Sequence, residues 1–92
     1  MSSYKKGAKL EYKVRDLLAR RGYFVVRSAG SRGPFDLVAL KKGEVLLVQC
    51  RADGRVSEEE RRELVELARS VGAKAFLAYK EEGIVKLVEL VA

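Results

Sequence analysis

Apolar residues recur along the first quarter of the chain with the spacing of a helix. In residues 7–21, four apolar side chains fall on one helical face: Leu10, Val14, Leu17 and Leu18. Gly22 follows at the point where a helix commonly ends in a left-handed residue. The pattern therefore predicts a first helix over residues 7–21.

Three apolar runs after this helix predict β-strands over residues 23–27, 35–41 and 44–51. Residues 29–34 separate the first two runs, and their two glycines and the chain's only proline exclude regular structure there. Lys42-Gly43 separates the last two runs and predicts a two-residue hairpin turn. Both hairpin strands are apolar on both faces, so we expect the sheet to be covered on each side.

The second half of the chain predicts one more helix and two more strands. Ser57 followed by three glutamates indicates a helix start in which Ser57 and Glu60 form a capping box. The helix carries a buried stripe of Leu64, Val65, Leu67, Ala68 and Val71. Gly72 ends it, and strands are expected over 74–79 and 84–91 around a Glu-Glu-Gly turn.

These elements predict an α/β fold in the order α-β-β-β-α-β-β. The connection from the third strand through the second helix to the fourth strand has the length of a right-handed parallel crossover. We therefore expect a mixed five-stranded sheet flanked by helices, with one helix on each face. The length of 92 residues suits one domain spanning 1–92.

Composition excludes several kinds of chemistry. The chain has no His and one Cys, which excludes zinc fingers, Ser-His-Asp triads, Cys-His nucleophiles and disulfide frameworks. No apolar run reaches the length of a membrane span, and the first residues lack the apolar stretch of a signal peptide. We expect a cytoplasmic protein without membrane partners, or one in a host cytoplasm if it is encoded by a virus. Abundant Glu, Lys and Arg with no Asn is typical of thermophiles.

The charge is unevenly distributed. The formal net charge is +6, yet residues 1–55 contain 13 basic and 5 acidic residues, whereas residues 56–92 contain 6 basic and 8 acidic ones. A positive first half indicates a face for a polyanion. The alternative is an ordinary charged surface of a thermophilic protein.

Pairing across the predicted hairpin brings polar side chains together at its open end. If Lys41 pairs with Glu44, paired residue numbers sum to 85, and Asp36 then faces Gln49. Directly opposed residues have Cβ atoms about 5 Å apart on the same face of a sheet. Arg51 lies two residues beyond Gln49 and shares that face. We therefore expect these three polar groups to converge.

This convergence suits a divalent cation. A carboxylate and an amide oxygen are hard ligands of the kind that Mg²⁺ accepts while it keeps several waters. Gln49 is the chain's only amide side chain and interrupts an apolar run. The alternative is an Asp36–Arg51 ion pair at a strand end. Glu11 lies at the edge of the first helix's apolar stripe, where it either reaches the same end of the sheet or is an ordinary surface glutamate.

Four segments carry a resemblance to a known family. In chain order they are Lys6-Gly7-Ala8 with Glu11, Val25-Val26-Arg27-Ser28-Ala29-Gly30-Ser31, Asp36-Leu37-Val38-Ala39, and Val48-Gln49-Cys50-Arg51. They resemble the archaeal-type Holliday junction resolvases of the PD-(D/E)xK nuclease superfamily. The similarity covers nearly the whole chain in the same order, and its Arg-Ser-Ala-Gly-Ser string is the most specific part.

The resemblance implies a restriction-endonuclease-like core and a homodimer that nicks four-way DNA junctions symmetrically, with Mg²⁺ (or Mn²⁺ as a substitute) in each subunit. It implies catalytic and metal-site positions at Glu11, Asp36 and Gln49, and a further catalytic position at Arg51. Arg27 and Ser31 match its positions near the scissile phosphate. Residues that flank the site are expected to contact DNA phosphates: Lys5, Lys6, Lys9, Arg27, Ser31 and Arg32.

Three residues differ from the family pattern. Gln49 stands in place of a Glu, Arg51 in place of a Lys, and Tyr12 in place of an Arg. Gln keeps the oxygen ligand but loses a charge, and Arg cannot act as a general base although it can neutralise the phosphorane. Metal-dependent junction cleavage is therefore weighed against binding of branched DNA without cutting, and against a partner-binding α/β module. A dimer surface is expected on exposed apolar residues of the second helix and the last strands.

Overall fold

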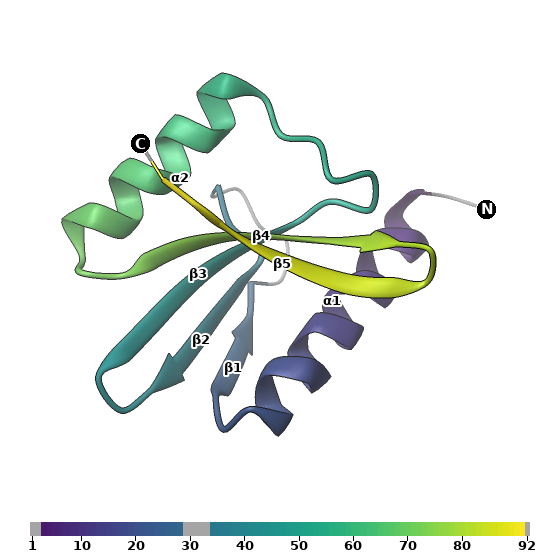
Figure 1. Ribbon diagram of the computed structural model, residues 1–92, viewed down its shortest axis with the longest axis horizontal. Helices are drawn as coiled ribbons and strands as arrows, with labels where there is room; N and C mark the ends of the chain where they lie inside the picture. The colour runs from purple at the N-terminus through teal and green to yellow at the C-terminus, as the bar shows by residue number, and fades with distance from the viewer. Residues whose placement is uncertain (1–2, 29–33, 92) are drawn as a thin grey trace.

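The predicted order of elements is confirmed in the computed structural model (Figure 1), in which residues 3–28 and 34–91 are described, the backbone alone for 3–8. The order is again α-β-β-β-α-β-β. The elements are α1 (Ser3–Arg20), β1 (Phe24–Arg27), β2 (Leu37–Lys41), β3 (Glu44–Cys50), α2 (Glu58–Ser70), β4 (Lys74–Glu81) and β5 (Ile84–Leu90).

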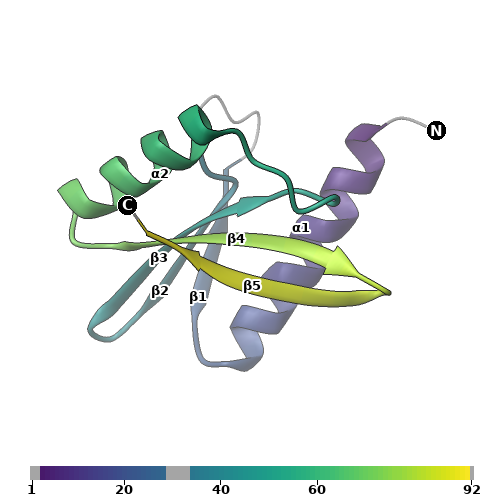
Figure 2. The same ribbon diagram turned by 45° about the horizontal axis from the view of Figure 1, so that its top comes forward.

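The five strands form one mixed sheet in the order β1-β2-β3-β4-β5. β3 and β4 pair in parallel through the α2 crossover, and the other neighbouring strands pair antiparallel. Figures 1 and 2 show α1 and α2 on opposite faces of this sheet. The expected mixed sheet with a helix on each face is therefore confirmed.

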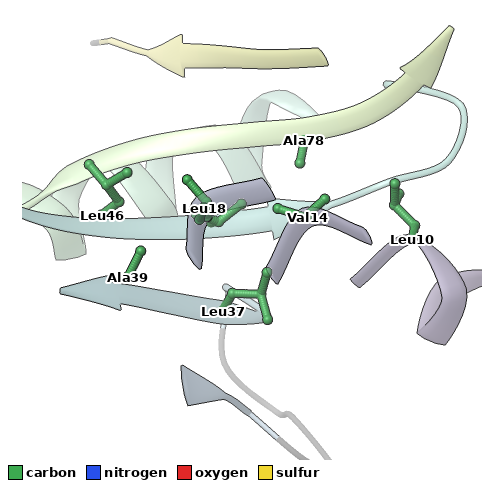
Figure 3. Packing of buried hydrophobic residues seen from close by; sticks show 8 residues of the cluster. Leu10, Val14, Leu18, Leu37, Ala39, Leu46 and Ala78 are labelled. Carbon is green, nitrogen blue, oxygen red and sulfur yellow. The ribbon is translucent and has the colours of Figure 1, made fainter. Parts of the chain in front are cut away.

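Alternating side chains of β3 explain why both faces need a helix. Leu46 and Val48 join the cluster under α1, whereas Leu47 joins the cluster under α2. In Figure 3 the apolar stripe of α1 lies against β2, β3 and β4, with these side chains labelled: Leu10, Val14, Leu18, Leu37, Ala39, Leu46 and Ala78. A strand whose side chains are buried on both sides reads as a continuous apolar run, as this one does.

The ends of several elements differ from the prediction. α1 begins at Ser3, about one turn before the predicted start at Gly7, because helical hydrogen bonding extends beyond the first apolar contact. β2 begins at Leu37, two residues later than predicted, since the chain bends at Asp36. β4 continues two residues further, to Glu81. β1 begins one residue later than predicted, and β3 and β5 each end one residue earlier.

The predicted turn and cap residues take the expected conformations. Gly22, just after α1, has φ +93°, a left-handed value that suits glycine. Ser57 and Glu60 form the complete capping box at the start of α2.

Among the described helices, none has the length and apolar character needed to cross a membrane.

Candidate active site

The β2–β3 hairpin has the predicted register. Its pairs run from Lys41↔Glu44 to Leu37↔Val48, so paired residue numbers sum to 85. Beyond the last pair the chain bends, and the Asp36 amide donates to the Val48 carbonyl at 2.8 Å. The open end of this hairpin therefore lies where the sequence predicts it.

The carboxylate of Asp36 is turned toward β3 by that bend. Its Oδ2 accepts a hydrogen bond from the Cys50 amide at 2.8 Å, and the Asp36 carbonyl accepts from the Ser28 amide at 2.8 Å. Among the hydrogen bonds of the described residues, none joins Asp36 to Gln49. The Asp36 carboxylate was predicted to face the Gln49 side chain. In the structure it contacts the backbone amide of Cys50, the residue after Gln49, instead.

Partial burial makes the charge of Asp36 costly. The pKa of its carboxyl is raised above the ordinary value, first by desolvation and also by the nearby charge of Glu11. The Cys50 hydrogen bond and the charges of Arg51 and Arg27 act in the opposite direction. Asp36 thus lies between one acidic and two basic neighbours, and a further cation would stabilise its charged form.

Glu11 reaches the same end of the sheet from α1. Its Oε1 accepts a hydrogen bond from Arg27 Nε at 2.6 Å, and its side chain is only 18% exposed. The Arg27 guanidinium also lies 4.9 Å from the centre of the Tyr12 ring. Of the two alternatives for Glu11, the structure shows the one in which its side chain reaches the end of the sheet.

Gln49 and Arg51 are bonded to each other. In the amide orientation that satisfies both ends of Gln49, its oxygen accepts from Arg51 Nε and Nη2 at 2.8 Å each, and its nitrogen donates to the Pro34 carbonyl. Gln49 is 8% exposed, so this oxygen is largely shielded from water. To act as the predicted metal ligand, the Gln49 oxygen would have to give up its two hydrogen bonds from the Arg51 guanidinium.

Glu60 is a member of this network that the sequence reasoning assigned to the helix cap alone. Its Oε2 pairs with Arg51 Nη2, while its Oε1 accepts from the Ser57 amide at 3.0 Å. One carboxylate therefore completes the capping box of α2 and holds Arg51. Arg51 lies just after β3 and Glu60 lies in α2, nine positions later, so periodicity along one element does not predict their contact.

The polar residues thus form two groups. Arg27 pairs in the sheet with Leu37, which is buried under α1, so we call Glu11, Arg27 and Asp36 the α1-side group. Cys50, which separates Gln49 from Arg51 in the chain, packs toward α1. Gln49 and Arg51 therefore belong to the opposite face, and together with Glu60 we call them the α2-side group.

Cys50 lies beside the α1-side group. Burial and the charges of Asp36 and Glu11 raise the pKa of its thiol, which keeps it neutral and unreactive.

The α1-side group has donors suited to a hard divalent cation. Asp36 and Glu11 bring two carboxylates close enough that the charge of Glu11 raises the pKa of Asp36. Mg²⁺ is commonly held by one or two carboxylates together with waters and substrate phosphates. Within residues 3–28 and 34–91, no cluster of three or more His, Cys, Asp or Glu is placed to hold a metal. The donor set therefore fits an open Mg²⁺ site and not a closed structural one.

The residues expected to contact DNA are only partly placed by the structure. Arg27 lies in the α1-side group, and Lys9 is exposed on α1. Lys5 and Lys6 belong to the first turns of α1, where the backbone alone is described. Ser31 and Arg32 lie outside the described residues.

Comparison with known proteins gives a consistent result. Residues 2–91 match the family model described as archaeal Holliday junction resolvase (Hjc). The structure is similar to that of Archaeoglobus fulgidus Hjc, a Holliday junction resolvase from an archaeal hyperthermophile. The TM-score is 0.78 at 26% identity, with 92% of this chain and 73% of that chain covered.

A curated relative extends the comparison to sequence. Over 84 residues the chain is 37% identical to the crossover junction endodeoxyribonuclease Hjc of Methanocaldococcus jannaschii, which covers 87% of this chain. The chain spans 62% of the length of that relative.

Proposed function

The chain belongs to the archaeal Holliday junction resolvase family, and from this premise we propose that it is a junction-resolving endonuclease. It would bind four-way DNA junctions and hydrolyse phosphodiester bonds with Mg²⁺. The observation that carries the proposal is the pair of carboxylates of Asp36 and Glu11, flanked by Arg27 and Arg51 at one end of the sheet. Such a site combines cation-binding oxygens with groups that attract a phosphate.

In this proposal Asp36 and Glu11 would hold the divalent cation. The bound cation would supply Lewis-acid polarisation of a phosphoryl oxygen and of the attacking water. The Asp36 carboxylate is fixed by the Cys50 amide, which limits its motion during the reaction. Arg27 neutralises part of the charge of Glu11 and is close enough to lower the pKa of Asp36, so it adds positive charge where the phosphate would lie.

Arg51 has a separate role as a fixed cation. Gln49 and Glu60 engage its Nε and Nη2 groups, and within the described residues its Nη1 group makes no hydrogen bond. Nη1 therefore provides donors for a phosphate oxygen, with the guanidinium already oriented. A preoriented donor that stabilises developing negative charge contributes to rate without reorganisation. The guanidinium does not lose a proton at neutral pH, so Arg51 stabilises charge and does not act as a base.

The predicted homodimer is part of the proposal. A four-way junction has two-fold symmetry, and a two-fold dimer would set one site on each of two strands. Val71 was predicted to be buried under α2 but follows the end of that helix and is exposed. Apolar side chains are also exposed on the last strand, at Val88, and on β1, at Phe24 and Val26. Light scattering of the purified protein tests this part directly, with a mass of two chains expected.

Binding without cutting is the second candidate. The Gln49 oxygen is hydrogen-bonded to the Arg51 guanidinium, so only the two carboxylates of the site are free to bind a cation. This arrangement supports a site that binds DNA but holds a metal ion poorly. This candidate predicts tight, salt-dependent junction binding with no metal-dependent product.

One experiment separates the candidates. A labelled synthetic four-way junction and a linear duplex are incubated with the protein in Mg²⁺, Mn²⁺ or EDTA, and products are resolved on native and denaturing gels. Paired symmetric nicks that need a divalent cation and disappear in Asp36→Asn, but not in the matched surface variant Glu63→Gln, support the resolvase. A shifted junction without nicks in either metal supports binding alone. Equal affinity for junction and duplex contradicts both candidates.

A further inference from the structure

Three lysines from two elements gather on the α1 face of the sheet, outside the candidate active site. Lys9 and Lys13 lie four residues apart on α1, and Lys80 lies on β4 two residues after Ala78, which is buried under α1. The pKa of Lys80 is lowered from its ordinary value, first by its neighbour Lys13, then by desolvation and by the charge of Lys9.

These lysines line two hollows between α1 and the β4–β5 hairpin. One has a volume of about 290 Å³ and is lined by Lys9, Leu10, Ala52 and Lys80. The other has a volume of about 330 Å³ and is lined by Lys13, Asp16, Leu17, Arg20, Ile84 and Val85. The hollows adjoin, because Lys80 lines the first and its cross-strand partner Val85 lines the second. We call the two hollows together the lysine groove, with four basic residues: Lys9, Lys13, Arg20 and Lys80.

Positive charge in the lysine groove is not balanced by the acids that line it. Asp16 is the one acid among the described residues lining the two hollows, and its carboxylate contacts Arg15 at 3.5 Å. Two ammonium groups side by side repel each other. An anion placed between them would reverse that repulsion into attraction, since phosphate oxygens accept hydrogen bonds from both.

The lysine groove also begins beside the candidate site. Leu10 in its wall precedes Glu11, and Ala52 follows Cys50 by two residues. Lys80 lies two residues past Ala78, the β4 partner of Cys50, which corresponds to about 7 Å along the strand. Figures 1 and 2 show the β4–β5 turn on the same side of the molecule as the N-terminal half of α1.

We propose that the lysine groove binds the sugar-phosphate backbone of the DNA arm next to the cleaved strand, with Lys13 and Lys80 sharing one phosphate group. This inference rests on the proposed function, since it assigns a path to the DNA of that same site. The groove offers charge and no fixed pattern of donors and acceptors for bases, so it recognises backbone and not sequence.

The test compares two charge-matched double variants. Lys13→Gln with Lys80→Gln removes the paired ammonium groups. Lys42→Gln with Lys74→Gln removes the same charge at the other end of the sheet, in the β2–β3 turn and at the start of β4. Junction affinity is measured by fluorescence anisotropy over a range of salt concentrations. Thermal unfolding and the nicking rate at saturating protein are measured in parallel.

For the groove variant we expect about tenfold weaker junction binding and a salt slope smaller by about 1, as for one lost phosphate contact. Its melting temperature should equal or exceed that of wild type, because a repulsion is removed, and its nicking rate at saturation should not change. Lys13→Arg with Lys80→Arg should retain affinity. Wild-type affinity in the groove variant, or an equal loss in both double variants, would overturn the inference while leaving the proposed function intact. Failure of the wild-type protein to bind junctions would overturn both.

Discussion

The two polar groups at the end of the sheet differ in how well their charges are compensated. In the α1-side group, Asp36 and Glu11 lie close together and partly buried, so the pKa of Asp36 is raised and one arginine pairs with Glu11. In the α2-side group, the Arg51 guanidinium is held by the Gln49 amide oxygen and by the Glu60 carboxylate. The first group gains from an added cation, whereas the second already has its charge in place.

This difference in charge compensation indicates that the two groups have different roles in the proposed reaction. A group whose charge is unfavourable in the free protein is stabilised by binding, so the proposed function assigns the metal to the α1-side group. A group that is already hydrogen-bonded costs nothing further to orient, so the α2-side group suits stabilisation of the developing charge. Replacing residues in each group should therefore affect different quantities.

The largest effect is expected in the α1-side group. Asp36→Asn should lower the junction nicking rate by about 10³-fold, since it removes a carboxylate from the cation site. The same change should raise the melting temperature, because a partly buried charge is lost while Asn can still accept from the Cys50 amide. Nicking assays and thermal unfolding of one preparation test both statements. A nicking rate equal to that of wild type would contradict the assignment of Asp36.

Replacing Arg51 should have the next largest effect. Arg51→Ala should lower the nicking rate at saturating Mg²⁺ by about 10²-fold, the usual loss for one preorganised donor. Arg51→Lys should recover part of the rate, because it keeps the charge and loses the two bonds to Gln49. Single-turnover nicking measures both variants, and junction affinity serves as the control for folding. A lysine variant slower than the alanine variant would show that charge at this position is not what matters.

A crossed pair of variants separates the two roles of Glu60. Glu60→Gln keeps the capping box and weakens the hold on Arg51, so nicking should fall about fivefold, in line with the loss of one charge-assisted bond of about 1 kcal/mol. Ser57→Ala removes the cap and should cost about 1 kcal/mol of stability while nicking persists. Denaturant unfolding and nicking of both proteins form the test. If both variants lose activity in proportion to stability, Glu60 acts only through the helix.

The smallest effect is on the pH dependence of stability. The pKa of Asp36 is higher in the folded protein than in the unfolded chain, so the folded state retains this proton over a wider pH range. Its contribution to stability is therefore full below the ordinary value of 3.8 and is lost as the pH rises through the raised pKa. Unfolding free energies of wild type and Asp36→Asn, measured from pH 3 upward, should diverge in favour of the variant as the pH rises. Parallel curves would contradict the shift.

The sequence predicted the framework better than the details of the site. Apolar periodicity predicted all seven elements, because burial against the sheet or a helix sets the spacing of apolar residues in each of them. The register counted from the Lys42-Gly43 turn placed Asp36 at the open end of the β2–β3 hairpin, because turn type and loop length fix the register of a hairpin. It did not predict the bend that turns the Asp36 carboxylate to the Cys50 amide, nor the bond between Gln49 and Arg51. Those depend on side-chain orientation, as does the contact between Glu60 and Arg51.

The division between the two groups is tested most directly by the Mg²⁺ dependence of junction nicking in two matched charge-neutralising variants. Glu11→Gln removes a carboxylate from the α1-side group, and Glu60→Gln removes one from the α2-side group. We predict that Glu11→Gln raises the Mg²⁺ concentration for half-maximal nicking by about tenfold, the effect of about 1.4 kcal/mol in cation binding. We predict that Glu60→Gln lowers the maximal rate at an unchanged Mg²⁺ requirement. An equal shift of the Mg²⁺ requirement in both variants would contradict the account.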